Sequence, residues 1–556
     1  MLGAVLAFPG GRLEMTGTFA SRSNIRSGAS PLPLDCTVHG AGRGDEGVCL
    51  ELRLGKRRLL LDCGLTDLTP LIGRGDALDA VLCSHAHRSS SFGLMEFQSR
   101  FPQVPVYASE VTRRLMPLNW AMEWELPDNF QGLPWRSPIA ITEDIIVELL
   151  PAGHLPGAAL FVITYGLPGA ATQPMRVVYT GDFFLSNSRL VEGLPLEEAR
   201  SHRPDVLILD GNYGTARHGR RRSQENAAAE QVRQALDQGQ SVLMPVTPLG
   251  MAQELIMLLR SHHRLTGRDV SILADGAIAR GCDAYLQILD QLPSSVQNFA
   301  RHQNLFWDDR VRPRLQRLTD GFMGSEVVLD IDSEGNPLDT DEPVIVLADE
   351  TQPLDRFLDG SLGEARSWRL LLLENSSAGL IERAFQGAKS SGATVDFYML
   401  SEHCDGLGTL QLIHNLRPQH AVFVHGAAAD LQDLASLEEL NSRYKLHCPE
   451  AGATVLLPIA EIFQQPSAPA ERYEGEVNEG REGVEIQLPQ AISLSEAWQA
   501  LIDTGIIEAR WQGNELVIRG LSQQELLEDR WVAPDRQHPP RYYLGNPNSD
   551  ENRPSS

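Results

Sequence analysis

The stretch "LCSHAHRSSSFGL", residues 82–94, carries two histidines, His85 and His87, one residue apart at the end of an apolar run. Such a pair points both imidazoles at one centre when the loop that follows is tight. Zinc binds imidazole nitrogen and carboxylate oxygen, usually four ligands in a tetrahedron. The pair alone fits a structural role as well as a metal site, so other histidines and aspartates would have to supply the remaining ligands.

Ten short apolar runs recur along the chain, at residues 57–64, 79–85, 176–182, 205–211, 241–246, 270–276, 343–349, 368–375, 394–401 and 420–426. Apolar runs without polar alternation predict strands that are buried on both faces, as in α/β folds. The stretch 250–262 between two of these runs predicts a helix, because Met251, Leu255, Leu258 and Leu259 fall on one face.

Acidic and histidine side chains stand at or just past the ends of these runs, namely Asp62, His85, Asp182, Asp210 and His425. Ligands bind at the carboxyl ends of strands in open α/β sheets. We therefore expect these side chains to converge on one edge of a sheet. His154 in "PAGHLPGAAL" and His403 in "SEHCDG" are further candidates, because neighbouring glycines let the backbone turn sharply.

The composition is that of a globular protein, with 42% apolar and 22% charged residues among 556. No window approaches 18 apolar residues, which argues against a transmembrane helix. The N-terminal "MLGAVLAFPGGRLEM" has a short apolar run but no basic residues before it, which argues against a signal peptide. The seven cysteines are odd in number and form no CxxC pair, which argues against a disulfide framework and a zinc ribbon. These features predict a cytoplasmic protein with no membrane partner.

The net charge of −25 means that the chain as a whole does not attract polyanions. Contact with RNA would therefore need a local basic patch. The stretch "TARHGRRRSQEN", residues 215–226, offers one candidate with Arg217, Arg220, Arg221 and Arg222. A solvated start of a helix explains the same residues equally well.

The motifs resemble the metallo-β-lactamase superfamily over residues 34–460, and within it the β-CASP branch of RNA-processing nucleases. That branch includes the nuclease subunits of the cleavage and polyadenylation factor and the J-type ribonucleases. The segments similar to its motifs are "LLLDCG" with Asp62, "SHAHRSSSFGL", "AGHLPGAA" with His154, "YTGD" with Asp182, "LILDGNYG" with Asp210, "LSEHCD" with His403 and "FVHG" with His425.

The resemblance implies one zinc held by His85, His87, His154 and Asp182. A second zinc would take an acid and a histidine from the second motif, a share of Asp182, and His403. Here Ser89 and Ser90 replace that acid and that histidine. Because a hydroxyl is a poor zinc ligand, we expect one zinc and a degenerate second site. Catalytic roles are expected for Asp62, Asp210, His403 and His425, or else these residues support the sheet edge through hydrogen bonds.

The fold class that the resemblance implies is α/β, a four-layer αββα sandwich with an inserted β-CASP domain. Its two parts would be residues 34–215 and 390–460, and the inserted α/β domain would be 216–389. A flexible leader (1–33), a linker (461–480), a small C-terminal α+β domain (481–535) and a disordered tail (536–556) complete the expected organisation. In the small domain, Ser493 and Glu496 have capping-box spacing, and "IIEARW" and "ELVIRG" read as a hairpin.

Three functions fit the sequence, and they leave open whether the chain hydrolyses anything. The first is an RNA-binding subunit with a weak or inactive nuclease site, acting as a homodimer or in a heteromeric complex with an active β-CASP nuclease. The second is an active zinc-dependent ribonuclease that cleaves phosphodiester bonds. The third is a metallo-hydrolase acting on a substrate other than nucleic acid, such as an ester or lactone. The late motifs around His403 and His425 disfavour the third.

Overall fold

The computed structural model describes residues 33–43, 46–73, 77–120, 125–166, 174–320, 327–329, 342–358 and 367–459, and four short strands between 476 and 520. The chain divides into two units. Residues 22–467 form the larger unit, and residues 1–21 and 468–556 form the other. The metal-ligand candidates all belong to the larger unit. Among the described residues, no helix is both long and apolar enough to cross a membrane.

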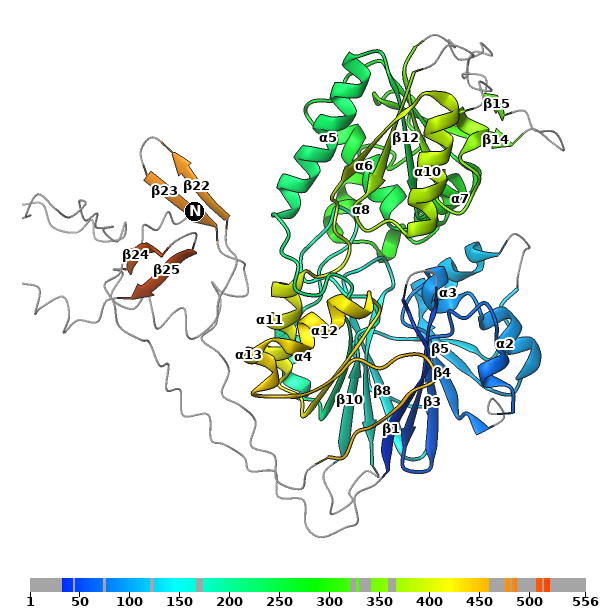
Figure 1. Ribbon diagram of the computed structural model, residues 1–556, viewed down its shortest axis with the longest axis vertical. Helices are drawn as coiled ribbons and strands as arrows, with labels where there is room; N and C mark the ends of the chain where they lie inside the picture. The colour runs from blue at the N-terminus through cyan, green and yellow to red at the C-terminus, as the bar shows by residue number, and fades with distance from the viewer. Residues whose placement is uncertain are drawn as a thin grey trace, which may run out of the picture. The chain divides into compact units, whose positions relative to one another are not determined.

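Two seven-stranded sheets form the lower part of the larger unit in Figure 1. The first sheet has the strand order β21 (Thr454–Leu456), β1 (Leu34–Ala41), β2 (Val48–Leu54), β3 (Arg57–Leu61), β4 (Ala80–Leu82), β5 (Val106–Ser109), β6 (Phe130–Leu133). The second has the order β20 (Lys445–His447), β19 (His420–Val424), β11 (Val206–Asp210), β10 (Met175–Tyr179), β9 (Ala159–Tyr165), β8 (Ile145–Pro151), β7 (Ile139–Ala140).

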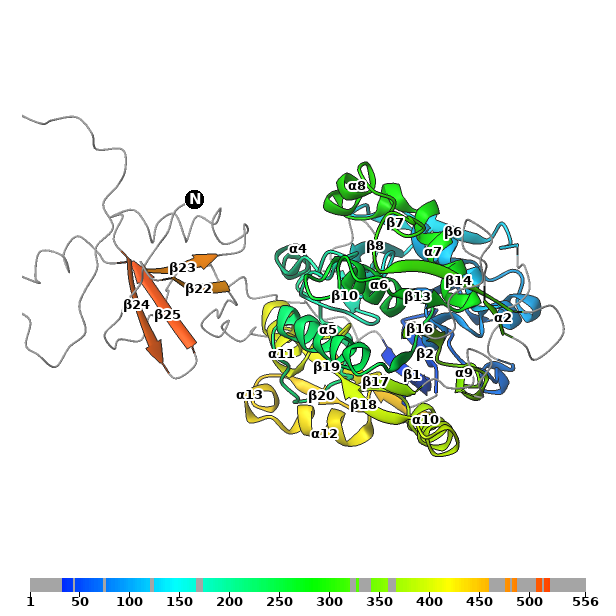
Figure 2. The same ribbon diagram turned by 90° about the horizontal axis from the view of Figure 1, so that it is seen from above.

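These two sheets pack face to face around one apolar core. Successive residues of a strand point to opposite faces, so Leu59 and Leu61 of β3 join the core between the sheets, whereas Leu60 joins the core under the outer helices. Both faces are covered at this end of β3, which explains why Leu59, Leu60 and Leu61 are all apolar, without alternation. Helices on both outer faces complete a four-layer αββα sandwich (Figures 1 and 2), and the predicted fold class is confirmed.

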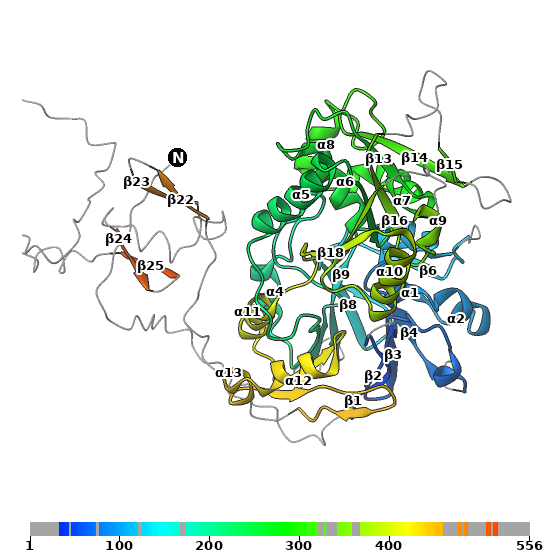
Figure 3. The same ribbon diagram turned by 45° about the horizontal axis from the view of Figure 1, so that its top comes forward.

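A third sheet is built from seven strands that lie between residues 241 and 398. Its order is β15 (Val327–Leu329), β14 (Arg314–Asp320), β13 (Ser271–Ala274), β16 (Val344–Asp349), β12 (Ser241–Val246), β17 (Trp368–Leu373), β18 (Thr394–Tyr398). Apolar residues of α5 (Arg221–Asp237), α6 (Met251–Ser261) and α7 (Gly276–Gln287) share a core with one face of this sheet. Those of α9 (Asp355–Leu358) and α10 (Ala378–Ser391) share a core with the other face. Figure 3 shows this three-layer part above the sandwich.

The helices of the first sheet's outer face are η1 (Thr69–Leu71), α1 (Arg88–Ser91), α2 (Leu94–Arg100), α3 (Glu110–Leu115) and η3 (Met116–Asn119). Those beside the second sheet are α4 (Leu196–His202), α11 (Gly406–Leu416), α12 (Ala428–Ser436) and α13 (Glu438–Asn441). Those of the third sheet's part are α5 (Arg221–Asp237), α6 (Met251–Ser261), α7 (Gly276–Gln287), η4 (Leu289–Gln291), α8 (Ser294–Ala300), α9 (Asp355–Leu358) and α10 (Ala378–Ser391).

All ten predicted strands and the helix at 250–262 are present. The inserted part, however, extends beyond its predicted end at residue 389, because β18 begins at Thr394 and pairs in parallel with β17 of the third sheet. The sequence shows that 394–401 is a strand but not which sheet it joins. The predicted leader lies outside the described residues, except for its last residue.

Two hairpins are described in the C-terminal unit. β24 (Ile507–Gln512) pairs with β25 (Glu515–Gly520), which confirms the predicted hairpin. β22 (Glu476–Gly480) pairs with β23 (Gly483–Gln487), so the last five residues of the predicted linker form a strand. In the sequence, the glycine and glutamate residues in and around β22 and β23 are typical of a linker, so this pairing was not predicted. The predicted helix near Ser493 and the predicted tail lie outside the described residues.

Candidate metal centre

Four predicted zinc ligands lie together at the ends of strands from both sheets of the sandwich. His85 and His87 follow β4, His154 follows β8, and Asp182 follows β10. One ligand atom of each lies within 4.8 Å of those of the other three. Gly153 before His154 and Gly181 before Asp182 both have positive φ angles. A Cβ at Gly153 would lie 2.1 Å from the Phe184 carbonyl oxygen, so this tight approach requires glycine.

Each of the three imidazoles uses one ring nitrogen for an outer hydrogen bond. His85 Nδ1 lies 2.9 Å from Ser84 Oγ, His87 Nε2 lies 3.0 Å from the Leu249 carbonyl oxygen, and His154 Nδ1 lies 3.0 Å from the Glu402 carbonyl oxygen. The other nitrogens face inward, and His87 Nδ1 is 3.0 Å from His154 Nε2. Outer partners of this kind fix the tautomer and orientation of metal-binding histidines.

The inward His85 Nε2 is buried and has no hydrogen-bond partner among the described residues. Burial, followed by repulsion from His85, lowers the pKa of His87 to about 3. Burial also holds the pKa of His154 well below its usual value. Both rings are thus neutral at pH 7, the form that offers a lone pair to a metal. Three neutral imidazoles and a carboxylate are a donor set that fits zinc.

Asp182 belongs to a second group as well, together with Asp210, His403 and His425. Asp210 ends β11, and His425 follows β19, its neighbour in the second sheet. His425 has a φ of 54°, in the left-handed region, which costs a non-glycine residue roughly 1–2 kcal/mol. Such backbone strain persists only where the surrounding structure imposes it, and it clusters at functional sites.

The two carboxylate oxygens of Asp182 face different groups. Oδ2 lies 3.3 Å from His85 Nε2 and 3.8 Å from His154 Nε2, whereas Oδ1 lies 2.9 Å from His425 Nδ1. The resemblance placed His403 beside Asp182, and one ligand atom of His403 does lie within 4.8 Å of one of Asp182. His403 Nδ1 pairs with Asp210 Oδ2 at 2.7 Å. His425 Nδ1 is the histidine nitrogen that faces Asp182 Oδ1. Its position follows from β19, which pairs in parallel with β11, so that both strands end at the same edge of the sheet.

The second group holds opposite charges in contact. Burial would lower the pKa of His425, but the carboxylates of Asp182 and Asp210 hold it well above its usual value. Burial would likewise raise the pKa of Asp182, but attraction from His425 and then His85 keeps it well below the usual range. Without a cation, these residues form imidazolium–carboxylate pairs.

Comparison with known proteins identifies the family. Residues 42–234 match the metallo-beta-lactamase superfamily. The "Uncharacterized protein sll0514" of Synechocystis sp. (strain ATCC 27184 / PCC 6803 / Kazusa) is 46% identical over 503 residues, which cover 88% of this chain and 87% of that protein. The chain belongs to the metallo-β-lactamase superfamily.

More distant relatives of this metallo-β-lactamase protein have names from RNA metabolism. Integrator complex subunit 11 of Gallus gallus is 22% identical over 482 residues, covering 78% of this chain and 75% of that protein. An RNase J-like protein of Methanocaldococcus jannaschii is 26% identical over 274 residues, covering 46% of this chain and 61% of that protein. The similarity to the first of these extends well beyond the family match at 42–234.

Ser89 and Ser90 lie in α1, which begins at Arg88, the residue after His87. Ser90 is 1% exposed, and its Oγ has no hydrogen-bond partner among the described residues. Its carbonyl oxygen accepts a hydrogen bond from the Cys63 backbone N–H at 2.8 Å. On this side the metallo-β-lactamase sandwich therefore offers hydroxyls, in place of the carboxylate and imidazole that the resemblance implies.

Only part of the predicted basic patch is available to RNA. Arg217, Arg220 and Arg222 are exposed at the start of α5. The side chain of Arg221 is 11% exposed and donates to the Ser401 carbonyl, with Glu254 Oε2 3.5 Å away. The guanidinium of Arg221 is thus committed to contacts within the chain, whereas the other three arginines of the predicted patch are exposed. In the sequence, the four arginines of this stretch cannot be distinguished until the place of each relative to the helix is known.

Several residues around the first group were not predicted from the sequence. The Leu249 and Glu402 carbonyls hold His87 and His154, and a backbone carbonyl leaves no residue-type signal. The Glu402 side chain stands close by. A Cβ at Gly250 would be 3.2 Å from Glu402 Oε1 and 3.5 Å from His87 Nε2. Burial raises the pKa of Glu402 to about 8.

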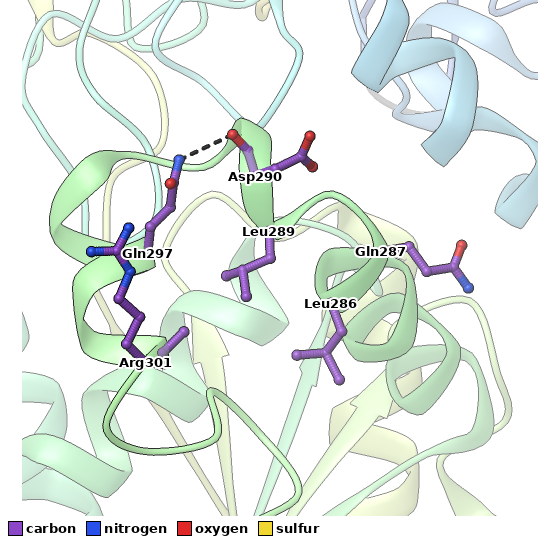
Figure 4. A pocket seen from close by; sticks show the side chains of 7 residues that line it. Leu286, Gln287, Leu289, Asp290, Gln297 and Arg301 are labelled. Atoms are coloured by element: carbon purple, nitrogen blue, oxygen red, sulfur yellow. Dashed lines mark hydrogen bonds between the residues drawn. The ribbon is translucent and has the colours of Figure 1, made fainter.

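A pocket of about 410 Å³ lies between α7 and α8 (Figure 4). Leu286 and Leu289 line it, and the Gln297 side chain donates to the Asp290 carbonyl at 3.0 Å beside it. None of the candidate ligand residues lines this pocket. A second hollow of about 370 Å³ is lined by Arg217, His218 and Phe397 among others, between the start of α5 and β18.

Proposed function

We propose that this chain is a cytoplasmic β-CASP-type protein of RNA processing or decay that binds one zinc firmly and hydrolyses RNA slowly or not at all. It would act by binding RNA, as a homodimer or in a complex with an active nuclease of its own branch. The observation that carries the proposal is the complete first ligand group beside Ser89 and Ser90. The RNA-related names of its distant relatives support the choice of substrate class.

A bound zinc polarises a phosphoryl oxygen and lowers the pKa of water. The chain's own residues set how far this chemistry proceeds. His85, His87, His154 and Asp182 supply four protein ligands, the number found in closed structural zinc sites. Ser89 cannot accept a proton at neutral pH as a carboxylate would. Slow hydrolysis follows, because no second-motif acid orients water against the phosphate.

The RNA-binding face is proposed at the start of α5. Arg217 and Phe397 line the same hollow, and Phe397 is 37% exposed. Single-stranded RNA is held by cationic side chains on its phosphates and by aromatic rings under its bases. Arg220 and Arg222 extend the cationic surface next to it. This combination suits single-stranded RNA better than a neutral ester or lactone.

Zinc content and RNA handling test the proposal together. The full chain should hold one zinc after dialysis and should bind a labelled single-stranded RNA with no more than slow cleavage. His154→Ala should lose the zinc, and His263→Ala, on the surface of the inserted part, is the matched control. Absence of firmly bound zinc, or absence of RNA binding in the wild type, would contradict the proposal.

An active zinc-dependent ribonuclease is the second candidate, and the second group favours it. Asp210 and His403 form a buried pair 2.7 Å apart next to Asp182, a geometry suited to moving a proton at a leaving oxygen. Rapid cleavage by the wild type that disappears in both His154→Ala and His403→Ala would select this candidate over the first.

A further inference from the structure

We propose that the hollow between the start of α5 and β18 is a recognition pocket for one unstacked guanine base of single-stranded RNA. The residues that line it include Arg217, Gln231, Glu374, Phe397 and Tyr398. The proposal rests on the proposed function in taking RNA as the ligand. It adds that this surface distinguishes one base from the other three, whereas contacts to phosphate alone carry no sequence information.

The first observation is the size and the make-up of the hollow. Its volume of about 370 Å³ lies within the usual range of pockets that enclose a small ligand. Phe397 and Met399 supply apolar surface, and Phe397 is 37% exposed. Arg217, an exposed residue before α5, lines the same hollow. An aromatic side chain for a base and a cation for its phosphate are what proteins use to hold single-stranded RNA.

The second observation is that two lining residues have a buried polar atom without a hydrogen-bond partner among the described residues. These atoms are Tyr398 Oη and Gln231 Oε1. Tyr398 is 2% exposed. Gln231 Nε2 donates to the Phe397 carbonyl oxygen at 3.1 Å, which fixes the orientation of the amide and leaves its oxygen unused. Buried polar atoms nearly always have a partner, so these two are groups that a ligand can satisfy.

The third observation is that hydrogen-bond acceptors outnumber donors among these groups. Gln231 Oε1 and the exposed carboxylate of Glu374 can only accept, whereas the Tyr398 hydroxyl can donate. Guanine is the base whose pairing edge carries two N–H groups, N1–H and N2–H₂, next to one acceptor, O6. Adenine and cytosine present a single amino group there, and uracil presents a single N–H. The donors and acceptors of the hollow therefore complement guanine.

Aromatic contacts connect the hollow to the second group of candidate ligands. His218, which also lines the hollow, packs edge-on against Tyr213 with ring centroids 4.1 Å apart. The ring centroid of Tyr213 in turn lies 6.2 Å from that of His403. His218 Nδ1 lies 2.9 Å from Ser401 Oγ, which holds the imidazole in place. A base in the hollow is thus two ring contacts away from His403, so the neighbouring nucleotides of the same strand lie close to the sheet edge.

Binding of matched oligonucleotides to the full chain tests the pocket without relying on activity. A labelled oligouridylate is compared by fluorescence anisotropy with the same RNA carrying one central guanosine, adenosine or cytidine. We expect guanosine to tighten binding about tenfold and the other two bases to have little effect. Glu374→Gln and Tyr398→Phe should each remove most of the guanosine effect, because each changes one group that the base would contact. Glu382→Gln, at an exposed carboxylate of α10, is the matched control and should keep the effect.

The outcomes separate the pocket from the proposed function. A guanosine effect that is absent in the wild type, or that is unchanged in either variant, overturns the pocket but leaves the proposed function standing. Absence of binding by every RNA contradicts the proposed function itself.

Photocrosslinking gives a reading that does not depend on any variant. An oligouridylate with one 6-thioguanosine, whose sulfur replaces O6, is bound to the wild-type chain and irradiated. Mass spectrometry of the peptides should find the crosslink at Tyr398 or its neighbours Phe397 and Met399. A crosslink confined to other parts of the chain, or none in a complex that anisotropy shows to have formed, overturns the pocket.

Discussion

Asp62 reaches His85 through Ser84, whose hydroxyl lies 2.7 Å from Asp62 Oδ2 and 2.9 Å from His85 Nδ1. Asp62 is fully buried and also accepts the Tyr179 hydroxyl at 2.5 Å and the Ser84 backbone N–H at 2.6 Å. It is therefore an outer support of the first group and belongs to neither cluster of ligands. Its predicted catalytic role becomes a positioning role.

Asp62→Asn should weaken the firmly bound zinc about 10–100-fold, the usual loss when an outer partner of a metal-binding histidine is changed. The amide keeps the shape but cannot accept all three hydrogen bonds as a carboxylate does. Competition with a chromophoric chelator measures the affinity. Asp67→Asn, at an exposed loop position, is the control. An unchanged zinc affinity in Asp62→Asn would contradict the role.

Ser89→Asp should raise the zinc content of the full chain above one ion, because it returns to α1 the carboxylate that the resemblance assigns to a second zinc. Ser89 is only partly buried, so the larger side chain meets less resistance there than at Ser90. Titration of chelator-stripped protein with Zn²⁺ against a chromophoric competitor measures the number of ions bound. Ser295→Asp, near the start of α8, supplies the control. If both variants behave alike, the added charge acts only at long range.

Glu254→Gln should lower the free energy of unfolding by about 3 kcal/mol, since it breaks a buried charge contact. Glu254 is 4% exposed and accepts the Ser188 hydroxyl at 2.7 Å and the Leu190 backbone N–H at 2.8 Å. These contacts tie α6 to the segment that follows Asp182. Urea unfolding measures the loss, with the exposed Glu382→Gln as control. A change below about 0.5 kcal/mol would show that the contact is dispensable.

Substitutions of the neighbouring residues Arg221 and Arg222 should affect different properties, stability in the first case and RNA affinity in the second. Arg222→Ser should weaken single-stranded RNA binding and reduce the salt dependence of log K by about 0.7, the value of one phosphate contact. Arg221→Ser should instead lower the free energy of unfolding by about 3 kcal/mol, since it leaves Glu254 unpaired. Fluorescence anisotropy at several salt concentrations and urea unfolding distinguish the two. Equal effects of both changes would contradict this division.

Acidification should destabilise the chain through His420 and His447. His420 Nδ1 lies 3.0 Å from His447 Nε2, so these two nitrogens cannot carry a proton at the same time. Burial, then repulsion from His420, lowers the pKa of His447 to about 4. The unfolded chain therefore binds more protons, and stability present above pH 6.5 is lost as the pH falls toward 4. Urea midpoints at pH 7 and pH 5 test this, and His447→Gln should flatten the difference.

The sequence predicted strands that contain a short run of apolar residues, such as β3 and β11. A short apolar run of this kind has few other structures in which all of its side chains are buried. The group of His85, His87, His154 and Asp182 was predicted through the resemblance of their motifs to the family, and the structure brings the four together. The sequence did not distinguish His403 from His425 as the neighbour of Asp182. That choice depends on which strand lies beside β11, which is a matter of topology. The contacts of Arg221 could not be predicted for a similar reason, since they involve Glu254 and Ser401, which are distant in the sequence.

Asp210 and His425 lie on adjacent strands but are separated in the chain by the whole third sheet. Synthesis proceeds at roughly 5–20 residues per second, so roughly 10–40 s pass between the emergence of one and of the other. The first ligand group is complete once Asp182 has left the ribosome. A nascent chain therefore holds the complete first ligand group well before the second group exists, while β11 has only β10 beside it and still lacks β19.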